Sequence, residues 1–175
     1  MEGAGTLELL AELAIGVLGF SGIVAAIGQR GSGEWAPMDR GRFFFMVFSG
    51  ALVIILALLP FPLHYAGLEV ASLWSWSSGA GALLIFLYFI GVKRATPNAG
   101  VREMYRDPEA SNVALGFGLL ASFGSVLLLC LNAMGILFDR TFVPYLVAVL
   151  LIFVVSLVAF VRFLQAAVRR GGRAA

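Results

Sequence analysis

The chain has 175 residues, of which 61% are hydrophobic and 13% charged, and its mean hydropathy is +0.97. Soluble domains are typically about 45 to 50% apolar, so this composition excludes an ordinary water-soluble fold. The formal net charge of +2 is too small to indicate a nucleic-acid partner, and the single cysteine, Cys130, leaves neither an internal disulfide nor a cysteine-based metal site available.

Five long apolar runs follow one another along the chain. A hydrocarbon layer of about 30 Å requires about 20 residues of helix, and each run meets that length. We therefore predict an all-α fold, a polytopic integral membrane bundle of five transmembrane helices that forms one membrane domain over residues 1–175. An alternative with four spans merges the second and third runs into a re-entrant helix pair, because Pro60 and Pro62 lie close to the short connection between them. The predicted helices are 7–28, 43–63, 71–92, 113–138 and 141–163.

The basic residues alternate between the two sides that such a topology would have. None precedes the first run, three follow it, none lies between the second and third runs, four lie before the fourth, one lies in the next turn, and four occur from Arg162 onward. The excess of Lys and Arg in cytoplasmic segments places loops 29–42 and 93–112 and the tail 164–175 inside, and the amino terminus outside. We expect a multi-pass protein of the plasma membrane, specifically a bacterial inner membrane, with the lipid bilayer as its surroundings.

The first run carries two unusual features on one face. Glu8, Glu12, Gly16, Gly19 and Gly22 fall within a stripe about 120° wide at 100° per residue. Small residues at this spacing typically allow another helix to approach closely, with the carboxylates marking the outer rim. The alternative is a site for an ion or a proton, because carboxylates in membrane segments often face water-filled cavities. We prefer the packing interpretation.

Glu69, at the outer side of the third run, completes the candidate ion or proton site with Glu8 and Glu12. The fourth run has its own small-residue face, which we expect to meet small residues of the third run. Asn132 is predicted to donate hydrogen bonds across that helix interface. The fifth run is crowded with branched and aromatic residues, so we expect it to face lipid. The predicted seam of the fourth run comprises Gly118, Ser122, Ser125 and Asn132.

Motifs for catalysis are missing from the sequence. It contains no HExxH, GxSxG, P-loop or TVGYG-type filter sequence, and no facing pair of carboxylates within the runs. We therefore predict no enzyme activity, catalytic residue, metal or cofactor. The expected function is that of a structural or accessory subunit that packs with itself, as a homo-oligomer, or with a membrane-protein partner. The alternative is an oligomeric channel or transporter for a cation or proton, with an acidic outer entrance that includes Asp139.

Overall fold

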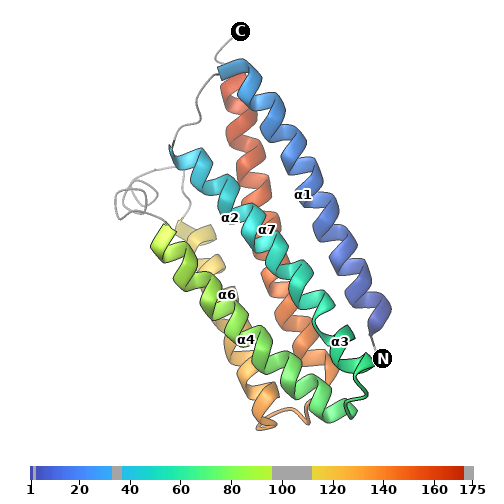
Figure 1. The fold of residues 1–175 in the computed structure, drawn as a ribbon. Coiled ribbons are helices and arrows are strands. Elements are labelled where there is room, and N and C mark those ends of the chain that lie inside the picture. The colour runs from blue at the N-terminus through green and yellow to red at the C-terminus, as the bar shows by residue number, and fades with distance from the viewer. Residues whose placement is uncertain (2, 33–36, 96–111, 172–175) are drawn as a thin grey trace.

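The computed structural model describes the backbone of residues 1, 3–32, 37–95 and 112–171, and the side chains of residues 1, 3–26, 43–91, 94 and 116–165. Its helices are α1 (Ala4–Ser32), α2 (Pro37–Leu58), α3 (Pro60–Tyr65), α4 (Val70–Ala95), α6 (Asn112–Met134) and α7 (Phe142–Gly171) (Figure 1). Five segments are long and apolar enough to cross a membrane: Ala4–Ala26, Phe43–Tyr65, Val70–Gly91, Gly116–Met134 and Phe142–Gln165. The prediction of a five-span helical membrane protein is confirmed, since the second and third runs each form a full-length span.

The helices extend beyond several of the predicted bounds. The helix predicted over 7–28 continues to Ser32, the loop predicted over 29–42 is partly taken up by α1 and α2, and α7 extends to Gly171. Most of the predicted loop 93–112 and the last residues of the tail lie outside the described residues.

The fourth span ends earlier than the sequence suggested. A helix was predicted through residue 138, but α6 ends at Met134 because Gly135 adopts a positive φ of 69°. The N–H of Ile136 then donates to the carbonyl of Leu131 at 3.2 Å, and the N–H of Gly135 donates to the carbonyl of Asn132 at 3.2 Å. These two bonds form the Schellman motif, which closes a helix at a glycine. The predicted end was wrong because a lone glycine in an apolar run gives no sign of its φ.

The second span is broken at Pro60. Proline has no N–H, so the carbonyl of Leu56, four residues earlier, lacks its usual helical donor. The hydroxyl of Tyr145 in α7 donates to that carbonyl at 2.5 Å. The Leu56 and Tyr145 side chains are completely buried. A side chain of another helix thus supplies, in the core of the bundle, the donor that Pro60 lacks.

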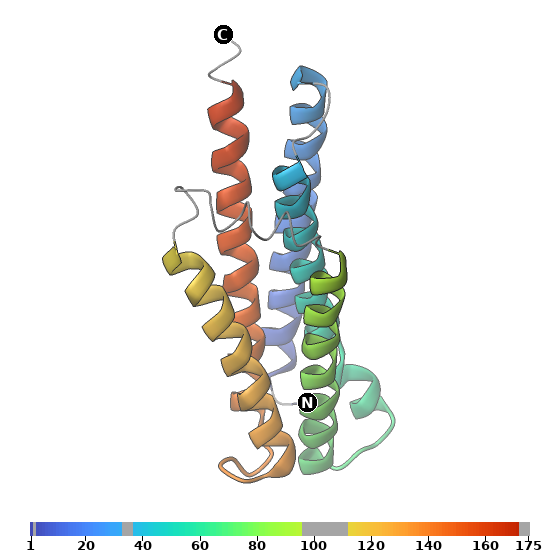
Figure 2. The same ribbon diagram turned by 90° about the vertical axis from the view of Figure 1, so that its left-hand side faces the viewer.

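α7 lies at the centre of the bundle. It packs against α6, α2 and α1, and α4 packs mainly on α6 (Figures 1 and 2). The expectation that this helix faces lipid was wrong, because one side of it is buried over much of its length. Lipid tails are as apolar as leucine, so large apolar side chains do not distinguish a lipid-facing helix from a central one. Its buried residues include Tyr145, Ala148, Val149, Ile152, Val155 and Phe163.

The first residues of α1 and the last residues of α7 lie at opposite ends of the bundle (Figure 1). We call the end that holds Met1 and the α6–α7 turn the amino end, and the opposite end the carboxyl end. Near the amino end, Trp74 packs its ring against those of Phe142 and Tyr145, with centroids 5.2 and 5.6 Å away. This aromatic group is part of the main apolar core and joins α4 to α7.

Candidate functional site

The acidic and glycine stripe of α1 faces away from the rest of the bundle. Glu8 and Glu12 are exposed, and so are Gly16, Gly19 and Gly22. A Cβ built on any of these three glycines would meet nothing within 4 Å. No helix of the described chain therefore approaches the stripe. The opposite face of α1 is buried against α2 and α7 and carries Leu7, Leu10, Ala11, Ala14, Ser21 and Ala25.

The depth of Glu12 follows from a contact at the amino end. The first span begins at Ala4, directly after Gly3, whose backbone packs so closely on the Phe142 ring that a Cβ there would overlap it. Glu12 lies nine residues further along α1, or about 13 Å at 1.5 Å per residue. Half of a hydrocarbon layer of about 30 Å is about 15 Å. On this reference Glu12 lies well inside the layer, on the face of α1 that no other helix of the described chain covers.

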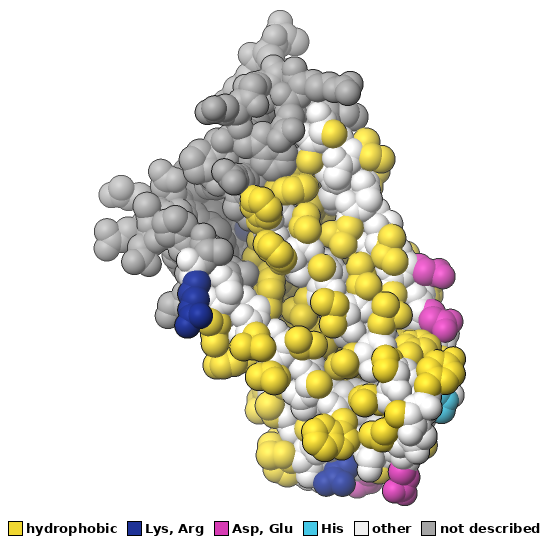
Figure 3. All heavy atoms as spheres, viewed as in Figure 1, with side chains coloured by type: hydrophobic (Ala, Val, Ile, Leu, Met, Phe, Trp, Pro, Cys, Tyr) yellow, Lys and Arg dark blue, Asp and Glu magenta, His cyan; other side chains and the backbone are white. Residues whose placement is uncertain are grey.

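Glu69, the third carboxylate of the predicted ion site, lies elsewhere. It lines a cleft of about 370 Å³ at the amino end, together with Asp139, Arg140 and the buried Trp74. Figure 3 shows the acidic side chains in two separate places, over α1 and at the amino end. The chain by itself therefore does not bring Glu69 together with Glu8 and Glu12. Within the described residues, no group of three His, Cys, Asp or Glu side chains is suited to hold a metal ion.

The residues of the predicted α6 seam do not all pack against the same helix. Ser122 and Ser125 are buried, and the Ser125 hydroxyl lies 2.7 Å from the carbonyl of Ala121 in its own helix and 3.2 Å from that of Ala148 in α7. Gly118 has nothing within 4 Å of a built Cβ. The serine part of this face is thus turned to α7, and its glycine contacts no neighbouring helix.

Asn132 joins three parts of the chain. Its side-chain amide donates to the hydroxyl of Ser78 in α4 at 2.8 Å and to the carbonyl of Thr141 at 3.1 Å, and its side-chain carbonyl accepts from the N–H of Thr141 at 3.1 Å. Thr141 directly precedes α7, so Asn132 fixes the start of that helix as well as the contact between α4 and α6. The hydroxyl of Ser75 adds a bond from α4 to the carbonyl of Ala133 at 2.7 Å.

Sequence reasoning missed the Tyr145–Leu56 bond, although the sequence carries a signal for it. A proline beyond the first turn of a helix leaves one carbonyl without its helical donor, and in lipid such a group needs a partner. A buried tyrosine on a neighbouring span is a suitable donor. Ser77, by contrast, has the one buried side-chain oxygen without a hydrogen-bond partner among the described residues.

No protein-family model matches the chain, and no curated protein or solved structure is significantly similar to it.

Proposed function

We propose that this protein is an assembly subunit of the membrane, and that the outward stripe of α1 is the surface through which it packs with a second copy or with a membrane-protein partner. The observation that carries this proposal is the exposure of Gly16, Gly19 and Gly22 beside Glu12. Glycines at this spacing have little use on a lipid-facing surface, whereas in a helix pair they let two backbones approach closely.

The cost of leaving Glu12 in lipid supports the same conclusion. A charged side chain at the centre of a membrane helix costs about 2.5 to 3.5 kcal/mol on insertion scales, and the cost is lower near the interface. A partner helix that offers a hydrogen-bond donor, or a water-filled gap between subunits, removes much of that cost. The stripe thus combines a shape suited to helix contact with a carboxyl group that lipid solvates poorly.

The test replaces Gly19 by leucine, in the middle of the stripe. Because nothing lies within 4 Å of a Cβ at this position, the fold of the single chain should tolerate the new side chain, while a tightly packed partner should not. Gly91→Leu is the matched control, since Gly91 is also exposed with open space beside it but lies on α4, away from the stripe. Native mass spectrometry from mild detergent should show an assembled species that Gly19→Leu loses and Gly91→Leu keeps. A strictly monomeric wild type without bound protein would refute the proposal.

The second candidate is an oligomeric channel or transporter for a cation or proton. The observation that favours it is that Glu8 and Glu12 share one exposed face, so several copies meeting there would line a gap with carboxylates. Ion flux into liposomes that is lost in Glu12→Gln would support it. Background flux with the wild-type protein would remove it and leave the assembly role.

The proposed orientation has the amino terminus outside and the carboxyl terminus in the cytoplasm of a bacterial cell, because the basic residues gather in alternate connections. Reporter tags on the two termini should report opposite compartments. Two tags in the same compartment would contradict the orientation.

A further inference from the structure

The outward stripe of α1 restricts the kind of partner that can cover it, and this step rests on the assembly role proposed above. Glu12 lies about 13 Å along α1 from Gly3, within a hydrocarbon layer of about 30 Å. It is exposed, and no described residue forms a hydrogen bond or an ion pair with it. Because lipid tails offer no hydrogen-bonding groups at that depth, a partner has to supply them.

A second copy of this chain is poorly suited to cover the stripe. Copies with the same pattern of basic residues insert in the same orientation, so two α1 helices packed through their stripes are parallel. In a symmetric pair of this kind, each residue lies at the level of its own counterpart. The carboxyl group of Glu12 then faces that of Glu12 in the second copy. Two carboxylates that share a site repel each other unless one of them takes up a proton.

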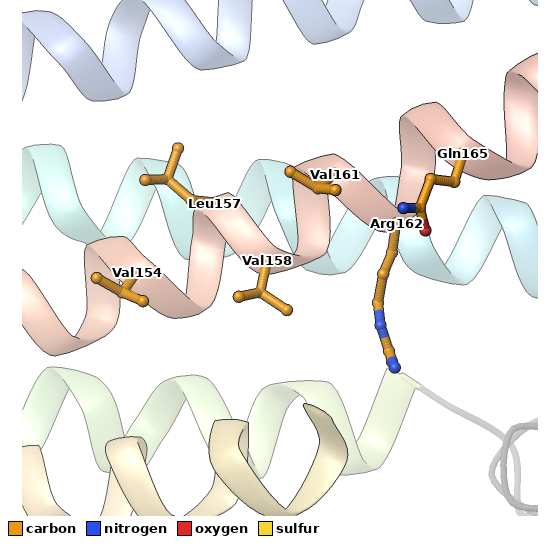
Figure 4. Close-up of a pocket in the computed structure, with 6 residues that line it drawn as sticks. All are labelled: Val154, Leu157, Val158, Val161, Arg162 and Gln165. Carbon is orange, nitrogen blue, oxygen red and sulfur yellow. The ribbon is translucent and has the colours of Figure 1, made fainter. Parts of the chain in front are cut away.

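The five spans supply no basic residue at the level of Glu12. Their one Lys or Arg residue is Arg162, which projects from α7 near the end of its span and therefore lies toward the carboxyl end (Figure 4). The single histidine, His64, is the last residue but one of the second span, at the amino end. Copies of this chain in one orientation therefore bring no opposite charge to Glu12, whichever face they present.

We propose that the stripe binds a transmembrane helix of a different membrane protein, and that this helix has a Lys or Arg residue near the middle of the bilayer. Gly16 and Gly19 let the two backbones approach closely, and the basic side chain forms a charge-assisted hydrogen bond with the carboxylate of Glu12. Glu8 lies one turn away on the same exposed face, within reach of the same long side chain. Acidic and basic residues inside membrane spans typically pair in this way.

The test measures binding of the full-length protein to two designed peptides in phosphatidylcholine vesicles. Each peptide is a single membrane-spanning helix of leucine and alanine, with either lysine or leucine at its central position. A central lysine lies near the level of Glu12 whichever way the peptide inserts. Förster transfer between labelled protein and labelled peptide reports binding. The lysine peptide should bind about tenfold more tightly than the leucine peptide, as expected for the gain of one charge-assisted hydrogen bond.

Three variants assign this preference to the stripe. Glu12→Gln retains the size of the side chain and should abolish the preference for the lysine peptide. Glu69→Gln removes the same charge in the cleft at the amino end, away from the stripe, and should leave the preference unchanged. Gly19→Leu should weaken the binding of the lysine peptide, because the two backbones can no longer approach closely.

Equal binding of the two peptides to the wild-type protein would overturn this inference. If the protein then forms a dimer that Gly19→Leu abolishes, the stripe binds a second copy and the assembly role stands. If neither peptide binds and the protein is monomeric, the assembly role fails as well. Equal losses of lysine-peptide binding in Glu12→Gln and Glu69→Gln would assign the attraction to the overall charge of the protein and would also overturn the inference.

Discussion

The bond between Tyr145 and Leu56 allows a quantitative test of how this bundle tolerates a proline. Tyr145→Phe removes the hydroxyl and leaves the Leu56 carbonyl without a donor, because Pro60 supplies none. Both residues are completely buried, so water does not replace the bond. An unsatisfied buried acceptor costs about 1 to 3 kcal/mol, while hydrogen bonds between membrane helices contribute at most about 1.7 kcal/mol in measured cases. We expect a loss of about 1 to 2 kcal/mol in the free energy of unfolding.

The assay is equilibrium unfolding in mixed detergent micelles, followed by circular dichroism, on a double-mutant cycle with Pro60→Ala. Alanine restores an N–H four residues after Leu56, so Tyr145→Phe should cost less than about 0.5 kcal/mol in that background. Tyr88→Phe is the matched control. The Tyr88 hydroxyl also donates to a helix carbonyl, that of Phe45, at 3.3 Å. Unlike the Leu56 carbonyl, the Phe45 carbonyl still has a backbone N–H four residues later, that of Ser49. An equal cost of Tyr145→Phe in both backgrounds would show that the hydroxyl does not compensate for the proline.

Two further variants test the packing of the bundle by the same unfolding assay. Asn132→Leu should lower the free energy of unfolding by about 2 to 3 kcal/mol, because Asn132 bonds both to Ser78 and to the start of α7. A loss below about 0.5 kcal/mol would refute this role. Gly50→Leu should destabilise the protein by about 1 to 3 kcal/mol, since a Cβ on Gly50 would lie 2.8 Å from the Leu18 side chain. Gly91→Leu, where a Cβ meets nothing within 4 Å, should change the free energy of unfolding by less than about 0.5 kcal/mol. Equal effects of the two glycine substitutions would contradict the close approach of α1 and α2.

The number of spans was predictable from the sequence because the requirement of lipid for long apolar helices is simple and strong. The arrangement of the spans was not, because apolar side chains are equally suited to lipid and to the bundle core. α7 illustrates this, since some of its branched and aromatic residues, such as Tyr145 and Val149, are buried in the bundle while others, such as Val143, are exposed. Polar residues were more informative. Asn132 was expected to bond across a helix interface, and the structure places its amide 2.8 Å from the Ser78 hydroxyl.

The candidate site was only partly predictable for a different reason. Helical periodicity places Glu8, Glu12 and the glycines on one face, and the structure retains that face as a continuous exposed stripe. Periodicity within one helix carries no information about which way that face turns, and none about residues on other helices. Glu69 was grouped with the stripe from its expected side of the membrane, yet it lies in the cleft with Asp139.

The position of α7 has a consequence for biosynthesis. α1 packs on α2, and α4 packs on α6, so the chain forms two helical hairpins. The two hairpins have few contacts with each other, and α7 contacts both of them. Because it follows the others in the chain, α7 is translated after both hairpins. At about 5 to 20 residues per second, synthesis of its thirty residues takes roughly 2 to 6 seconds. Through that interval the groups that contact α7 in the folded bundle, among them the Ser125 hydroxyl and the Trp74 ring, have other neighbours.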